Sequence, residues 1–573
     1  MPNLSFNLKN FTIENLLNDI EMGNIALPEI QRPYVWDPTK ARDLIDSLYK
    51  GLPVGSIILW DIYEVNGVKE INPEIKSNPK YLVIDGQQRL TSLFSIIKNK
   101  NIISKSGQKF KLKIAFNPIE ERFEVSNPAI EKDVRWIADI SEIFEKPAIY
   151  SFINNYVSKL EEKGITFDEG QVASKIERLK GIIQYPFSII ELSSELNPEQ
   201  VSEIFVRINS TGKRLNQSDF IMTLMSVYWP EGRKEIESFY KESFKEADKR
   251  PSPYNLIKIN PTPENLIRSI VGLAFRRGRL GYAYLILKGR DLENKIITEE
   301  LRKKNFEKFK EAQREVLDLI NWHDFVKIIY SAGFISEELI SSKVTFFITY
   351  SFYLIGKEYK IEYKYLESLI RKWFVASILT QRYTGSSESI FEEDLKNLSP
   401  SNYAAYIENE IKVSLTDDFW NIQLPERLKS SSLRNYAFLT YISSLIRDNV
   451  KILFSDTYLK DYLNPFIKEK KKTIDIHHIF PKAVLKGKGL NEEEIDQVAN
   501  YLYLEYKDNI RIKDKHPREY FPELVDKYEN GNFEMVYATY DLPEEFWSME
   551  YERYLEKRRE LMANRIRKYF STL

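Results

Sequence analysis

The sequence near the C-terminal end reads Asp475-Ile476-His477-His478-Ile479-Phe480-Pro481. The chain has four histidines in all, so an adjacent pair stands out. Because a strand points successive side chains to opposite faces, one histidine can bind a metal ion while its neighbour acts on a water molecule. Histidine titrates near neutral pH, which suits a general base, and a divalent cation stabilises charge on a leaving oxygen. The stretch therefore holds the groups that phosphodiester hydrolysis needs, although such a pair is also found as plain hydrogen-bonded surface.

Two asparagines follow downstream, Asn500 and, nine residues later, Asn509. In this order the residues resemble the HNH, or ββα-metal, nuclease family. The resemblance implies that His478 is the general base, that His477 and Asn509 bind a metal ion, and that Asn500 orients the base through a hydrogen bond. Many relatives have an acidic residue at the position of His477. Asp475, two residues back on the same face of the strand, is therefore a competing or additional ligand.

The two remaining histidines have separate interpretations. Some HNH relatives carry a third ligand histidine after the final asparagine, and His516 is the candidate here. Pro517 follows it and the spacing differs from the family pattern, which argues against the assignment. His323 lies in a helical Trp-His-Asp stretch and is expected to be structural.

A second polar motif, Asp85-Gly86-Gln87-Gln88-Arg89, follows a predicted strand and precedes a predicted helix. A strand, a sharp turn and a helix form a usual setting for a ligand held at a helix N-terminus, although such turns also begin ordinary helices. Two further segments, one with Arg32 and one with Arg207 and Asn209, add arginines and amides that can contact phosphate. The Gly-x-x-x-x-Gly-Lys-Ser/Thr loop is absent, so nucleotide hydrolysis of the P-loop class is excluded.

These three segments, in order, resemble the ParB-like domain in the first half of GmrSD-type restriction enzymes and of SspE-type defence proteins. The resemblance implies that this domain binds and hydrolyses a nucleoside triphosphate, and that the second half is an HNH nuclease. By this resemblance the candidate residues are Arg32, Asp85, Gly86, Gln87, Gln88, Arg89, Arg207 and Asn209, of which Asp85, Gln88 and Arg89 are candidates for catalysis. Arg32 and Arg89 are expected on phosphates, and Asp85 on a metal ion or the attacking water.

The spacing of apolar residues predicts a helix-rich α+β protein. Strands are expected at 56–60, 80–84, 111–116, 187–192 and 473–476. Helices are expected at 11–22, 39–49, 90–97, 264–275, 300–322, 361–379 and 433–447. We predict a ParB-like α/β domain over 1–229, a helical region over 230–455 and a ββα-metal nuclease domain over 456–573.

The composition bears on what the chain can bind and on the compartment in which it functions. Lys plus Arg total 83 and Asp plus Glu total 84, so any DNA-binding surface must come from the distribution of charge in space. Cysteine is absent, which excludes disulfides and fits a reducing cytoplasm. We see no secretion signal in residues 1–17. The longest apolar run, 344–355, is shorter than the ~20 residues of a membrane-spanning helix, so a buried helix is expected there and no membrane association.

Together these features predict a cytoplasmic DNA endonuclease of anti-phage defence, acting on modified phage DNA and regulated by a nucleoside triphosphate of unknown identity. The expected metal is Mg²⁺, Mn²⁺ or Ni²⁺, and a homodimer is left open. Two alternatives remain. One is a nucleotide-binding DNA regulator or switch with a vestigial HNH segment, which the balanced charge keeps open. The other is an RNA-cleaving toxin.

Overall fold

The structure is a computed structural model of the 573-residue chain. It describes residues 5–28, 34, 36–61, 68–69, 79–103, 109–145, 149–196, 200–201, 204, 217–245, 252–291, 296–466 and 474–573. The chain divides into two compact units, Met1–Arg233 and Lys234–Leu573, and each is described by itself.

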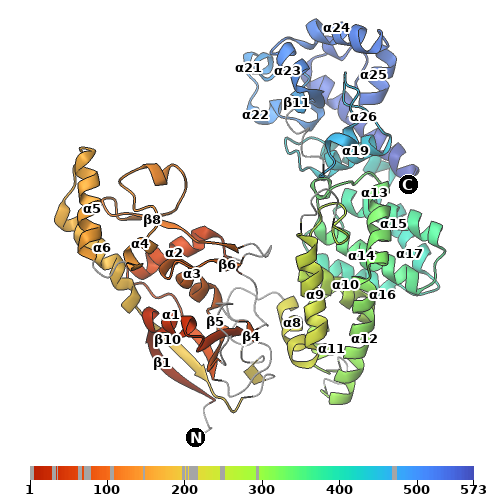
Figure 1. Cartoon of the computed structure of the whole chain (residues 1–573). Coiled ribbons are helices and arrows are strands. Elements are labelled where there is room, and N and C mark those ends of the chain that lie inside the picture. Colours follow the sequence, from red (N-terminus) through yellow and green to blue (C-terminus); the bar gives the residue numbers. More distant parts are fainter. Residues whose placement is uncertain are drawn as a thin grey trace. The chain divides into compact units, whose positions relative to one another are not determined.

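The first unit is built on a six-stranded mixed sheet, with strand order β1-β10-β3-β5-β2-β4 (Figure 1). Its strands are β1 (Phe6–Thr12), β2 (Ile25–Pro28), β3 (Ile57–Asp61), β4 (Val68–Lys69), β5 (Tyr81–Asp85) and β10 (Pro186–Leu192). The pairs β10–β3 and β5–β2 are parallel, and the other three are antiparallel. Two small hairpins lie outside the sheet: β6 (Ile102–Ile103) with β7 (Lys109–Phe110), and β8 (Ile114–Asn117) with β9 (Arg122–Val125).

Alternating apolar side chains give the central strands two buried faces. On one face Ile57 and Val83 join the main core of the unit. On the other, Ile58 and Ile84 join a smaller core. The strands predicted at 56–60, 80–84 and 187–192 are confirmed as β3, β5 and β10, and the one at 111–116 is confirmed in its last residues by β8. β1 was not predicted, because most of its side chains are exposed and its position depends on pairing with β10.

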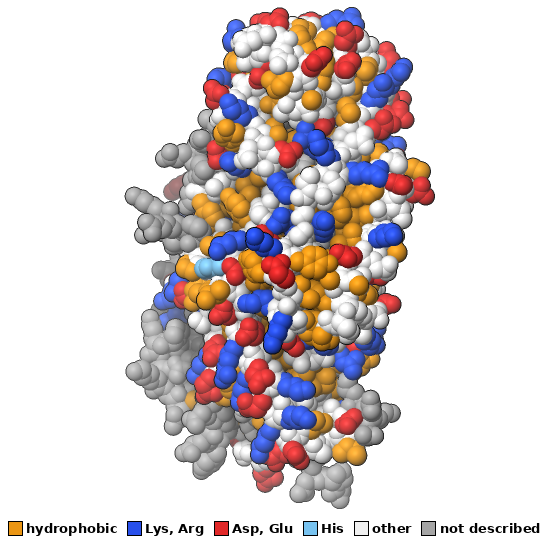
Figure 2. Space-filling model, turned by 90° about the vertical axis from the view of Figure 1, so that its right-hand side faces the viewer, with side chains coloured by type: hydrophobic (Ala, Val, Ile, Leu, Met, Phe, Trp, Pro, Cys, Tyr) orange, Lys and Arg blue, Asp and Glu red, His pale blue; other side chains and the backbone are white. Residues whose placement is uncertain are grey.

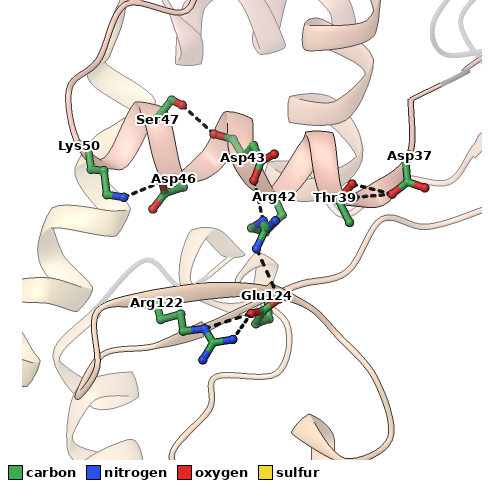
Figure 3. Close-up of polar contacts among 9 residues, drawn as sticks. All are labelled: Asp37, Thr39, Arg42, Asp43, Asp46, Ser47, Lys50, Arg122 and Glu124. Carbon is green, nitrogen blue, oxygen red and sulfur yellow. Dashed lines mark hydrogen bonds and ion pairs between the residues drawn. The ribbon is translucent and has the colours of Figure 1, made fainter. Parts of the chain in front are cut away.

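Helices cover the main core of this unit. The predicted helices at 11–22, 39–49 and 90–97 are confirmed. The helices are α1 (Ile13–Glu21), α2 (Pro38–Tyr49), α3 (Gln87–Ile97), α4 (Ser141–Glu145), α5 (Ile149–Glu162), α6 (Glu169–Lys180) and α8 (Gln217–Tyr228). Asp37 starts α2 by accepting a hydrogen bond from the Thr39 backbone N–H, and Arg42 joins α2 to Glu124 of β9 (Figure 3).

The second unit begins as a helical region. After α9 (Pro230–Ser243), which spans the boundary between the units, its helices are α10 (Pro263–Phe275), α11 (Leu280–Leu287), α12 (Glu299–Leu317), α13 (Leu319–Ser331), α14 (Lys343–Glu358), α15 (Tyr363–Leu379), α16 (Ser387–Asn397), α17 (Tyr403–Ser414), α18 (Leu424–Arg427), α19 (Tyr436–Arg447) and α20 (Leu459–Tyr462). The apolar run at 344–355 forms the buried helix α14, as predicted. The single helix predicted at 300–322 is wrong: Asp318 adopts extended backbone and caps α13, so two helices form.

The C-terminal part of this unit contains a two-stranded antiparallel sheet followed by a helix. β11 (Ile474–His478) pairs with β12 (Tyr501–Glu505), and α23 (Tyr506–Ile512) follows directly. Between the strands lie α21 (Lys482–Gly487), α22 (Glu492–Ile495) and the short turn η5 (Val498–Asn500). After α23 come α24 (Pro517–Glu529), α25 (Phe533–Tyr540) and α26 (Tyr551–Ser571). α26 packs against α19 and η5, so it connects the helical region to the strands.

Surface charge is mixed on the face that Figure 2 shows. Lys and Arg side chains alternate there with Asp and Glu, and the described residues of this face form no extended basic area. None of the helices in the part of the chain that the structure describes is long and apolar enough to cross a membrane.

Arg558 of α26 holds the segment around Asn500. Its guanidinium donates to the carbonyls of Ala499 (2.6 Å) and Tyr501 (2.9 Å), and the side chain is fully buried. Arg558→Met removes the guanidinium donor from both carbonyls and leaves that of Ala499 with the Tyr554 hydroxyl, 3.1 Å away. We therefore predict that unfolding in denaturant shows a loss of roughly 1–3 kcal/mol. Arg553→Met, at an exposed position of the same helix, is the control and should change stability by less than ~0.5 kcal/mol. Equal stability of the two variants would contradict the structural role.

Candidate active site

The two histidines of β11 face opposite ways, as the strand geometry predicts. His477 is buried, and its ring lies between Asn509 of α23 and Tyr520 of α24. His478 is half-buried, and its ring contacts Asp496, just after α22. The two imidazoles therefore have separate environments.

The protonation of His477 follows from the hydrogen bonds of one tyrosine. The Tyr520 hydroxyl lies 2.8 Å from the carbonyl oxygen of Ile479 and 3.0 Å from Nε2 of His477. A phenol has one proton and a carbonyl can only accept, so Tyr520 donates to Ile479 and accepts from Nε2–H of His477. Burial lowers the pKa of His477 to about 4, so the ring is neutral at pH 7. Nδ1 of His477 therefore carries a lone pair.

That lone pair faces another acceptor. Nδ1 of His477 lies 2.8 Å from Oδ1 of Asn509, whose Nδ2 donates to Oδ2 of Asp475 at 3.1 Å. Turning the Asn509 amide over would only bring its oxygen against the Asp475 carboxylate instead. In either orientation, two electron-rich atoms meet without a proton between them. A cation placed among the three side chains would remove this conflict.

The three side chains are a suitable but small ligand set. Imidazole nitrogen, amide oxygen and carboxylate oxygen together suit a divalent ion such as Mn²⁺ or Ni²⁺, and Mg²⁺ keeps several of its waters in such sites. In the part of the chain that the structure describes, no group of three or more His, Asp or Glu side chains is arranged to hold a metal ion. The remaining ligands at this site would be water.

His478 is held by a carboxylate that the sequence analysis did not single out. Nε2 of His478 donates to Oδ1 of Asp496 at 2.7 Å, and Asp496 also accepts from Nζ of Lys482 at 2.9 Å. In the neutral ring, the lone pair is therefore on Nδ1. Burial lowers the pKa of His478, and Asp496 partly offsets this effect. The ring of Tyr501 packs edge-on against the imidazole, with ring centroids 4.8 Å apart.

Asn500 acts on the backbone, which differs from the predicted role. Its side chain accepts from the N–H of Phe480 at 2.9 Å and donates to the Phe480 carbonyl at 3.0 Å. These bonds fix the chain two residues beyond His478, and no bond from the Asn500 side chain to the imidazole is found. Asn500 is fully buried and therefore fixes the backbone that follows His478.

The other two histidines are structural. His516 begins α24, where its Nδ1 accepts from the Arg518 backbone N–H at 3.3 Å. Its ring packs against Phe480, so these contacts give it no part in the group formed by His477, Asn509 and Asp475. Nε2 of His323 donates to the carbonyl of Pro253 at 2.6 Å, in agreement with the structural role expected.

In the first unit, the Arg89 side chain bonds to other groups of the protein. The sequence had predicted that it contacts a phosphate. Its guanidinium donates to the carbonyls of Val54 (2.6 Å) and Ser56 (2.8 Å) and to Asp85 (3.0 Å). Gly55 has a φ of +83°, and an added Cβ there would lie 2.5 Å from Nη1 of Arg89. Arg89 thus ties α3 to the segment before β3, and Asp85 is its ion-pair partner rather than a free ligand.

The remaining predicted residues of the nucleotide site are only partly described. Gly86 forms the left-handed turn before α3, with a φ of +95°, and Gln87 and Gln88 occupy the first turn of that helix. Arg32, Arg207 and Asn209 lie outside the described residues. The structure therefore brings together Asp85, Gly86, Gln87, Gln88 and Arg89, and their binding of a nucleotide stays a prediction.

Comparison with known proteins adds independent evidence for the first unit. Residues 13–226 match the GmrSD restriction endonuclease, N-terminal domain. This match supports a relation to GmrSD-type restriction endonucleases. An uncharacterized protein of Methanocaldococcus jannaschii is 26% identical over 576 residues, covering 92% of this chain and 88% of its own length. Because so large a share of the chain is aligned, that similarity extends into the second unit.

The contacts of Arg89 predict a stability defect rather than a selective loss of ligand binding. Arg89→Lys keeps the charge but loses the fork that reaches three acceptors, so we expect a loss of roughly 1–3 kcal/mol in thermal or denaturant unfolding. Arg122→Lys is the matched control, because Arg122 is exposed and its ion pair, with Glu124, lies within the same short strand. Unchanged stability of Arg89→Lys would show that the guanidinium is free for another role.

Two substitutions should move the pKa of His478 in opposite directions. Asp496→Asn removes a carboxylate that raises it, so the pKa should fall further. Lys482→Met removes a cation that lowers it, so the pKa should rise. Histidine-ring NMR titration of the chelator-treated protein measures both, with His478→Ala used to assign the signal. Shifts of the same sign, or none, would contradict this geometry.

Proposed function

We propose that the chain is a metal-dependent DNA endonuclease of the HNH type, and that its N-terminal unit regulates cutting. The observation that carries the proposal is the pair of acceptors at His477 and Asn509, next to a second histidine whose Nδ1 has a free lone pair. The two antiparallel strands followed by α23 support it, since they place both groups in one small ββα arrangement.

In this proposal His478 is the general base. Asp496 holds Nε2–H, so Nδ1 takes a proton from the attacking water, and the paired carboxylate stabilises the imidazolium that forms. The lowered pKa of His478 keeps the ring in its neutral, proton-accepting form near pH 7. Asn500 fixes the backbone that follows the base, so the ring keeps its orientation.

His477, Asn509 and Asp475 would hold the metal ion. When bound, a divalent cation acts as a Lewis acid that stabilises negative charge on the phosphate and its leaving oxygen. Tyr520 contributes by keeping the proton of His477 on Nε2, away from the ligand atom.

The match of residues 13–226 supports restriction of DNA as the biological role. DNA is therefore the proposed substrate, and dependence on base modification is a proposal that rests on this match alone. Nucleotide regulation is proposed for the same unit. Because Arg89 bonds to the protein itself, the proposal does not use it as a phosphate ligand. It is based on the left-handed turn at Gly86, the start of α3 and the arginines outside the described residues.

The proposal is tested by cleavage of matched modified and unmodified phage DNA with Mg²⁺, Mn²⁺ or Ni²⁺, with and without each nucleoside triphosphate. His478→Ala should lower the rate about 10²- to 10⁴-fold while circular dichroism and thermal unfolding stay unchanged. His323→Ala is the control, because this histidine lies in the same unit and its ring bonds to the backbone carbonyl of Pro253. Equal cutting by wild type and His478→Ala would overturn the proposal, and cutting of RNA alone would favour a toxin.

The hydroxyl of Tyr520 should affect metal binding without touching the metal. In Tyr520→Phe the proton of His477 is free to move to Nδ1, where Asn509 accepts it, and the ligand lone pair is lost. We predict that affinity for Mn²⁺, measured by titration calorimetry, falls about 10- to 100-fold.

The matched control for this change is Tyr540→Phe. Tyr540 is also buried and its hydroxyl also donates to a backbone carbonyl, that of Lys451. This variant should bind Mn²⁺ as the wild type does. A similar loss of affinity in both variants would point to general destabilisation instead.

A further inference from the structure

A cavity of about 190 Å³ lies in the helical region of the second unit, away from the histidine pair. It is formed where the N-terminal end of α14 meets the C-terminal end of α15 and the segment that precedes α19. Its polar lining includes Ser342, Thr345, Ser377, Gln381, Thr384 and Arg434. The lining is thus rich in hydrogen-bond donors.

One of these donors is buried without a partner. Ser377 is 1% exposed, and its hydroxyl has no hydrogen-bond partner among the residues that the structure describes. A helical serine can bond to a backbone carbonyl of the preceding turn, but Ser377 does not. An unpaired buried hydroxyl lowers the stability of the fold by about 1–3 kcal/mol. A ligand in the cavity that Ser377 lines would supply the missing hydrogen bond.

The start of α14 supplies further donors to the same cavity. The hydroxyl oxygen of Ser342 accepts from both the N–H and the hydroxyl of Thr345, at 3.2 and 2.9 Å, so its own proton remains to be donated. The first N–H groups of a helix have no partner within it, and Ser342 serves only that of Thr345. The dipole of this 16-residue helix favours an anion at its N-terminal end.

The charge of the cavity has a single sign. Arg434 is its charged side chain, and no acidic residue is among the described residues that line it. Arg434 is exposed and forms no ion pair with the described residues. A second hollow, beside α10 and α12, differs in this respect, because Asp291 and Glu358 are among its lining residues and Glu358 pairs with Arg276.

We propose that this cavity is a binding site for a phosphate group. An unpaired buried hydroxyl, a helix N-terminus and an unpaired arginine together match a tetrahedral oxyanion that accepts several hydrogen bonds. The volume is below the ~300–1,000 Å³ of pockets that enclose drug-sized ligands, so the base and sugar of a nucleotide would stay outside. The ligand is therefore inorganic phosphate or the terminal phosphate of a nucleotide. The site does not depend on the proposed nuclease activity.

Calorimetric titration of the full chain tests this site, with potassium phosphate against potassium chloride at equal ionic strength, and with ATP in a separate arm. We expect saturable binding of phosphate, of ATP or of both. Arg434→Gln and Ser377→Ala should each weaken that binding about tenfold, the loss of one hydrogen bond to a charged group. Saturable binding of phosphate that both variants weaken identifies the free anion as a ligand. Binding of ATP alone identifies a nucleotide only where Arg434→Gln and Ser377→Ala weaken it, because the first unit is itself proposed to bind a nucleoside triphosphate.

Arg314→Gln is the matched control, because it removes an exposed arginine of the same unit from another helix, α12, and should leave binding unchanged. Ser377→Ala removes only one oxygen atom, so it reports on the site even if another variant is unstable. The proposal is overturned if neither anion binds saturably. It is also overturned if Arg434→Gln and Ser377→Ala bind both anions as the wild type does.

Discussion

The hydroxyl group of Tyr520 has one proton to donate, and the chemistry of the candidate active site depends on where that proton goes. The carbonyl of Ile479 takes it, so the hydroxyl can only accept from His477. Burial keeps His477 neutral, and its second nitrogen is then left with a lone pair against the oxygen of Asn509. A protein interior rarely leaves such groups unsatisfied. This unfavourable contact is the physical basis for placing a cation there.

The rest of the second unit keeps these groups in place. The register of β11 with β12 puts His478 opposite Tyr501, and Asn500 bonds to the backbone just beyond His478. Arg558 of the C-terminal helix bonds to the carbonyls on either side of Asn500. The same helix packs against α19 of the helical region. Support for the site therefore comes from both parts of the unit, including residues far apart in the sequence.

The sequence predicted those features that depend on local pattern. Strand alternation placed His477 and His478 on opposite faces, and the order of His477, Asn500 and Asn509 anticipated their meeting around β11 and α23. Asp496 and Tyr520 were missed, because they reach the histidines from 18 and 43 residues away and no spacing rule connects them. The sequence does not indicate which residue an aspartate or tyrosine side chain contacts in the folded chain.

Arg89 shows the opposite case, in which the motif did not predict the contacts that the residue makes within the protein. A strand, a turn and an arginine suggested a phosphate, but the nearby Gly55 lets the guanidinium approach two backbone carbonyls. Whether such an arginine bonds to a phosphate or to the backbone depends on where the segment before β3 lies, and the motif does not show this. Asp318 similarly divided one predicted helix, because a capping side chain outweighed the continuous amphipathic pattern.

The proposed metal site at His477 can be tested most directly by pulsed electron paramagnetic resonance of the protein with bound Mn²⁺. A coordinated imidazole gives a nitrogen coupling in the spectrum. We predict this coupling in the wild type and in His478→Gln, and its loss in His477→Gln. A spectrum without nitrogen coupling, or one in which the coupling persists in His477→Gln, would contradict the assignment of His477 as a metal ligand.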